Sequence, residues 1–149
     1  MTQARRRAVW ILAIWGVAAI GFGVTFFAGG GPADYADDKV RRAAGGAFLA
    51  LGFFGTPFMR WLTRGHPGQV VADERDESIG RRAANGGLIA VLLYVFALSI
   101  VLWERHEASG CVPVGWLWFM AYSSAALAYL VPALVSLLID FGIVDRGEG

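Results

Sequence analysis

Four long stretches of the chain contain no Asp, Glu, Lys, Arg or His, and the charged residues are confined to the segments between and beyond them. These stretches are 8–28, 43–59, 83–103 and 113–139. A helix needs about 20 apolar residues to cross the hydrocarbon layer of a membrane, and about 17 suffice. The pattern therefore predicts an all-α integral membrane protein with four transmembrane helices. Their expected bounds are about 8–28, 43–62, 83–103 and 113–139, with the charged group of Arg60 reaching back to the headgroups.

A soluble fold does not explain this pattern, because four wholly apolar helices would have no polar face to present to water. The composition agrees: 56% of residues are hydrophobic and 17% are charged, whereas about a quarter are charged in soluble domains. The first apolar stretch is too long for the core of a signal peptide, which has about 7–15 residues. We therefore expect a retained first span and a single four-helix transmembrane domain over residues 1–149.

The distribution of Lys and Arg predicts the orientation of the helices. With the N-terminus in the cytoplasm, the cytoplasmic segments hold nine of these residues and the outer loops hold four. Because positive charge is favoured on the cytoplasmic side, both termini are expected there, in a bacterial inner membrane. Short connections further predict an antiparallel bundle. Arg41 and Arg42 conflict with the rule, since they fall in the expected outer loop 29–42.

The segment 60–82 is expected to form a charged cytoplasmic loop that leads into the third span. Asp73 is placed to cap the following helix, and acidic residues in the first turn complement the positive end of the helix dipole. Glu77 and Arg81 are spaced for an ion pair four residues apart. The acidic first-turn residues are Glu74, Asp76 and Glu77, and the basic residues at the headgroups are Arg81 and Arg82. All these charges therefore have structural roles, and no catalytic role is needed to explain them.

The stretch DERDESIGRRA, residues 73–83, resembles a loop signature of an uncharacterised family of small bacterial and archaeal multi-pass membrane proteins. The signature is D-E-R-[DE]-x-x-I-x-x-[KR]-A, and it stands just before a transmembrane helix. The matching residues are Asp73, Glu74, Arg75, Asp76, Ile79, Arg82 and Ala83. The resemblance implies a membrane location and a cytoplasmic position for this segment. It implies no activity.

Several function classes are disfavoured by residues that the apolar stretches lack. Coupled transport needs an ionisable group at membrane depth, and these stretches have none. Haem held between two histidines is not expected, because His66 and His106 fall in loops on opposite sides. His106 remains a weak candidate for a pigment or metal at the outer surface. The lone Cys111 excludes paired-cysteine redox chemistry, and a net charge of +1 gives no reason to expect nucleic acid. No cofactor and no enzymatic activity are expected.

By elimination, we expect a non-catalytic accessory or structural subunit. It would pack against a larger respiratory, photosynthetic or translocation complex, or against itself. Its partners would be membrane lipids and other transmembrane subunits, including ones that bear pigment or haem. Pairs of small residues spaced four apart favour close helix packing: Ala19/Gly23, Gly46/Ala50, Gly86/Ala90 and Ser124/Ala128. The contact candidates are Asp73, Glu74, Arg75, Asp76, Glu77, Arg81, Arg82, Gly86, Trp116 and Trp118.

Two alternatives stay open. The first is a membrane sensor or regulatory protein that presents 60–82 to a cytoplasmic partner. The second is an uncoupled channel or a lipid-handling protein. Polar groups within the spans, among them Tyr94, Tyr122 and Ser123, are expected to form hydrogen bonds between helices rather than to line a path.

Overall fold

A computed structural model describes residues 3–62 and 74–142 of the chain. These residues form five helices and no strand. The helices are α1 (Gln3–Phe27), α2 (Pro32–Asp37), α3 (Lys39–Leu62), α4 (Glu74–His106) and α5 (Val114–Asp140). The protein is therefore all-α over its described part, as the sequence predicts.

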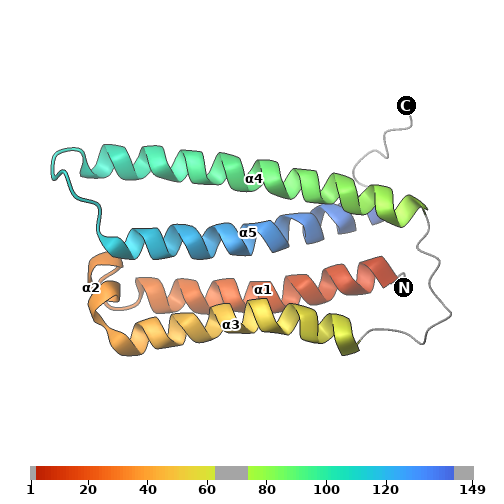
Figure 1. Ribbon diagram of the computed structural model, residues 1–149, viewed down its shortest axis with the longest axis horizontal. Helices are drawn as coiled ribbons and strands as arrows, with labels where there is room; N and C mark the ends of the chain where they lie inside the picture. Colours follow the sequence, from red (N-terminus) through yellow and green to blue (C-terminus); the bar gives the residue numbers. More distant parts are fainter. Residues whose placement is uncertain (1–2, 63–73, 143–149) are drawn as a thin grey trace.

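The four long helices lie side by side in the order α4, α5, α1, α3 (Figure 1). The main contacts of α1 are with α3 and α5, whereas the main contact of α4 is with α5 alone. Short α2 lies at one end of the molecule, where it touches the start of α5 (Figure 1). The start of α1 and the end of α5 lie at the opposite end, where the Arg5 guanidinium sits 4.4 Å from the Phe141 ring centre. The two outer helices, α3 and α4, thus each have one main long neighbour.

Three of the described helices are long and apolar enough to cross a membrane: Arg5–Phe27, Glu77–His106 and Val114–Asp140. They correspond to the first, third and fourth predicted spans. The predicted second span, 43–62, lies within α3, which is not among these three helices. Its uncharged stretch is the shortest of the four, and it includes four glycines, Thr56 and Pro57.

The helix boundaries differ from the prediction at two places. The expected outer loop 29–42 contains α2, after a turn in which Gly29, Gly30 and Gly31 have positive φ angles of 86°, 119° and 85°. Only glycine adopts such angles at little cost. In addition, α4 begins at Glu74, where the sequence predicts a helix to follow Asp73, so residues 74–82 of the expected loop extend the third span as a helix. Residues 63–73 lie outside the described part of the chain.

The Arg41 side chain caps the C-terminal end of α1. Its Nε donates to the Thr25 carbonyl at 3.0 Å, and its Nη2 donates to the Phe26 carbonyl at 2.7 Å. The last carbonyls of a helix have no partner within the helix and form the negative end of its dipole. The Arg41 side chain supplies both a hydrogen-bond donor and a positive charge there. This local role gives a physical reason for an arginine in the segment 29–42, whatever side of a membrane that segment occupies.

Aromatic side chains fill the core between α1, α2 and α5. Phe22, Phe26, Tyr35 and Tyr122 form one buried cluster, in which the Phe22 and Tyr122 rings stack with their centres 3.9 Å apart. A second set of contacts is centred on Trp15, which is 1% exposed. Its ring stacks on Tyr129 of α5 at 4.5 Å, and its Nε1 donates to Thr56 Oγ1 of α3 at 3.0 Å. The helix α1 is thus fixed to both of its long neighbours.

Candidate functional site

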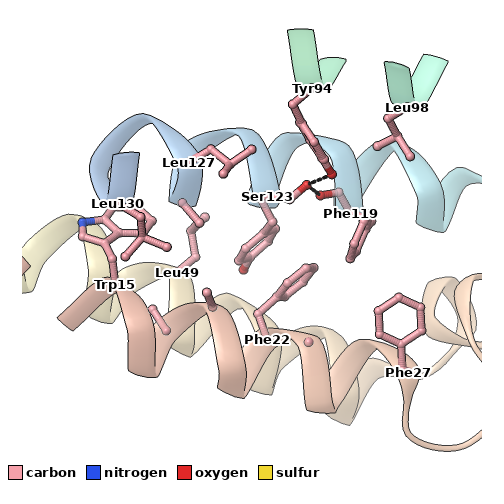
Figure 2. Close-up of a pocket in the computed structure, with 15 residues that line it drawn as sticks. Trp15, Phe22, Phe27, Leu49, Tyr94, Leu98, Phe119, Ser123, Leu127 and Leu130 are labelled. Carbon is pink, nitrogen blue, oxygen red and sulfur yellow. Dashed lines mark hydrogen bonds between the residues drawn. The ribbon is translucent and has the colours of Figure 1, made fainter. Parts of the chain in front are cut away.

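A cavity of about 510 Å³ lies between α1, α4 and α5 (Figure 2). It exists because α4 packs against α5 and leaves a space along α1. Its lining comes from four helices: Trp15, Ala18, Ala19, Phe22, Gly23 and Phe27 of α1; Leu49 of α3; Tyr94 and Leu98 of α4; and Phe119, Tyr122, Ser123, Ala126, Leu127 and Leu130 of α5. The volume falls within the range of about 300–1,000 Å³ that small-molecule sites occupy.

Small residues on α1 make room for this cavity. Ala19 and Gly23 belong to one of the pairs that the sequence suggested for helix packing. Both line the cavity, and a Cβ atom built at Gly23 would meet nothing within 4 Å. The sequence predicts that another helix packs closely on Ala19 and Gly23, whereas in the structure these two residues face the open space of the cavity.

Four side chains in the lining carry hydrogen-bond donors, and each donor is used within the chain. The indole of Trp15 donates to Thr56, and the Tyr122 hydroxyl donates to the Gly45 carbonyl of α3 at 2.5 Å. The remaining two, Tyr94 and Ser123, form a chain described next. The lining side chains would therefore offer a molecule in the cavity hydrogen-bond acceptors but no free hydrogen-bond donor.

Tyr94 of α4 and Ser123 of α5 form the polar point of the cavity (Figure 2). Their hydroxyl oxygens lie 2.5 Å apart, and Ser123 also hydrogen-bonds to the Phe119 carbonyl. Because a carbonyl cannot donate, Ser123 donates to Phe119, and Tyr94 therefore donates to Ser123. The Tyr94 oxygen keeps lone pairs that can accept a hydrogen bond. The hydrogen bonds of Tyr94 and Tyr122 both join different helices, as the sequence predicts for polar groups in the spans.

The lining contains no Asp, Glu, Lys, Arg, His or Cys. Across residues 3–62 and 74–142, no group of three or more His, Cys, Asp or Glu side chains could hold a metal ion. The cavity thus offers shape, apolar surface and one accepting hydroxyl. These features suit binding of a neutral molecule.

The charged contact candidates lie away from this cavity, at the start of α4. Arg81 Nη2 is 3.7 Å from Glu77 Oε1, and the two side chains are 73% and 67% exposed. Such exposed pairs contribute little to stability. Glu74, Arg75 and Asp76 lie in the first turn of α4, but the structure does not describe their side chains, and Asp73 lies outside the described residues. Arg82 is exposed next to Ala83, which is buried.

The other candidates divide between internal and exposed positions. Gly86 faces α5, where an added Cβ atom would lie 3.8 Å from Val135 Cγ2. The ring centre of Trp116 lies 5.7 Å from that of Phe119. Trp118 is half exposed, with its ring centre 6.3 Å from that of Tyr122. His106 lies at the end of α4 with its Nδ1 3.0 Å from the Leu102 carbonyl. None of these four residues lines the cavity.

No known family model, curated protein or solved structure matches the chain. The resemblance of residues 73–83 to the loop signature therefore stays a prediction. The geometry of the helices and of the cavity has to carry the functional argument.

Proposed function

We propose that the chain is a four-span protein of a bacterial inner membrane, with antiparallel helices and both termini in the cytoplasm. The support for α3 as the second span is its length and position. It has 24 residues, or roughly 36 Å of helix, which exceeds the hydrocarbon thickness of about 30 Å. It lies along α1 and exposes apolar side chains such as Leu51, Phe54 and Phe58. A lipid environment accommodates such a surface, and water does not.

Within that membrane the protein acts as a non-catalytic accessory subunit, and α4 is its docking helix. The observation that carries this proposal is that α4 has one main neighbour, α5. The rest of its surface is apolar over most of its length: Leu88, Ile89, Leu92, Leu93, Phe96, Ile100, Val101 and Trp103 are all exposed. A helix attached along one side only leaves a long surface for a transmembrane helix of another subunit. The neutral apolar stretches agree with a supporting role, because they contain no group that moves protons or electrons.

The experiment compares two exposed positions inside the membrane. In a Cys111→Ser background, a thiol-reactive photocrosslinker is attached to Leu93→Cys on α4 or to Ile20→Cys on α1. The native residues at these two positions are 65% and 70% exposed. We expect the α4 position to crosslink in native membranes to a subunit that also co-purifies in mild detergent. The α1 position is expected to give no such product. A crosslink from α4 to a second copy would assign the surface to self-association.

A protein that purifies alone, with the same crosslinks at both positions, would contradict the accessory role. In that case the second candidate, a lipid-handling protein, gains support. The observation that favours it is the cavity beside α4, which has a neutral apolar lining and the size of a ligand site.

A further inference from the structure

We propose that the cavity between α1 and α4 binds a neutral, single-chain lipid that carries a hydroxyl group. The occupant is held by its hydrocarbon chain along α1 and α5, and its hydroxyl group donates to the Tyr94 oxygen. This site is separate from the docking surface of α4. It requires only that α1, α4 and α5 cross the membrane, and these are the three helices apolar enough to do so.

The shape of the cavity suits a hydrocarbon chain. On α1 it extends from Trp15 to Phe27, a distance of roughly 18 Å along a helix. Side chains of α1, α4 and α5 line it, and most of them are apolar. A single extended chain can therefore lie along α1 with apolar contacts from three helices.

The depth of the cavity selects a neutral molecule. Tyr94 lies near the middle of the apolar stretch 83–103, and Ser123 lies near the middle of 113–139. A charged group at this depth is costly, and the lining holds no opposite charge to pair with it. A phospholipid headgroup is thus excluded from the polar point. An alcohol is small and uncharged, so it can reach the same depth.

The hydrogen-bond pattern selects a donor. The O–H and N–H groups of the lining side chains are already donated to Thr56, Gly45, Phe119 and Ser123. A ketone or ester oxygen would find no free donor among these side chains, whereas a hydroxyl group finds an acceptor at Tyr94. One hydrogen bond contributes about 0.5–1.5 kcal/mol, so the site should prefer an alcohol to the matched ketone by about two- to twelvefold.

The test uses the purified full-length chain in detergent and a hexadecanol probe with a photoreactive group in its chain. We expect saturable labelling of peptides that contain Leu98 or Leu127. Competition by hexadecanol should be about two- to twelvefold stronger than by the methyl ketone of equal length. Labelling without saturation, or labelling mainly at exposed Leu92, would overturn the proposal. So would loss of the cavity signal whenever another protein co-purifies, because a helix would then be the occupant.

Two variants with matched controls separate the chain from the hydroxyl group. Gly23 lines the cavity, so Gly23→Phe should fill it, whereas Gly16 on the same helix does not line it and Gly16→Phe is the control. A Cβ atom built at either glycine meets nothing within 4 Å. Saturable labelling should disappear in Gly23→Phe and persist in Gly16→Phe, and equal labelling of both would refute the site. Tyr94→Phe should keep the labelling but abolish the preference for the alcohol over the ketone. A preference that survives this substitution would refute the role of Tyr94.

Discussion

The contact between Gly87 and Pro132 decides whether α4 can stay on α5. A Cβ atom built at Gly87 would lie 2.5 Å from Pro132 Cγ and 2.9 Å from its Cδ. The proline ring is part of the α5 backbone and cannot rotate away, so Gly87→Ala must push the two helices apart. The neighbouring change Gly86→Ala offers a matched control, because there the added Cβ would lie at an ordinary contact distance of 3.8 Å from Val135.

The expected magnitude follows from the difference between these two variants. Both replace glycine by alanine at the same depth of the same helix, so both gain about the same helix propensity, about 1 kcal/mol in water. Only Gly87→Ala adds an overpacking cost of about 1–3 kcal/mol. We therefore expect its free energy of unfolding to lie about 1–3 kcal/mol below that of Gly86→Ala.

The assay is reversible unfolding in mixed micelles with an increasing fraction of a denaturing detergent, followed by circular dichroism. Hydrogen exchange of α4 gives a second readout, since a helix with one main neighbour should lose protection as a unit when that contact is strained. Equal stability of the two variants, or a more stable Gly87→Ala, would refute the close packing of α4 on α5.

Three further predictions use the same unfolding assay. Arg41→Met should lower stability by about 1.5–3 kcal/mol, because charged hydrogen bonds to the last carbonyls of α1 are lost, while Arg42→Met at an exposed position should change little. Thr56→Val should cost about 1–3 kcal/mol because the buried Trp15 N–H loses its acceptor; Ser99→Ala, which removes an exposed bond within one helix, is the control. Burial raises the pKa of Tyr35 above its ordinary value, against the opposing charges of Arg41 and Arg42. The folded state thus retains this proton longer than the unfolded state, whose pKa is about 10. Stability from this source should be complete below pH 10 and be lost as the pH rises through the folded pKa, and Tyr35→Phe should remove that loss.

The long helices were predictable because a membrane imposes a simple rule on sequence. Every backbone polar group must be paired within the hydrocarbon layer, so uncharged runs of sufficient length become helices. The apolar run alone places the start of the third span at Ala83, whereas α4 begins at Glu74, as the acidic first turn after Asp73 predicts. Charges in 74–82 end the apolar run, but they do not end the helix.

Contacts between helices were harder to predict than the helices themselves. Short α2 follows three glycines and depends on burial of Tyr35 among residues far away in sequence. Gly86 faces Val135 of α5 in the structure, whereas the sequence pattern fits packing within the chain and contact with a partner equally well. A small residue looks the same in sequence whether it meets its own chain, another chain or a cavity. The cavity arises because α4 packs mainly against α5. The hydrophobic pattern does not encode which helix α4 packs against.

The proposed transmembrane topology can be tested with the single native cysteine. Cys111 is exposed in the turn between α4 and α5. If α3 crosses the membrane and the N-terminus is cytoplasmic, this turn lies outside, and a membrane-impermeant maleimide should label Cys111 in intact cells that shield an N-terminal epitope. If α3 stays outside the hydrocarbon layer, the turn lies in the cytoplasm. Labelling only after the membrane is opened would then contradict the four-span account.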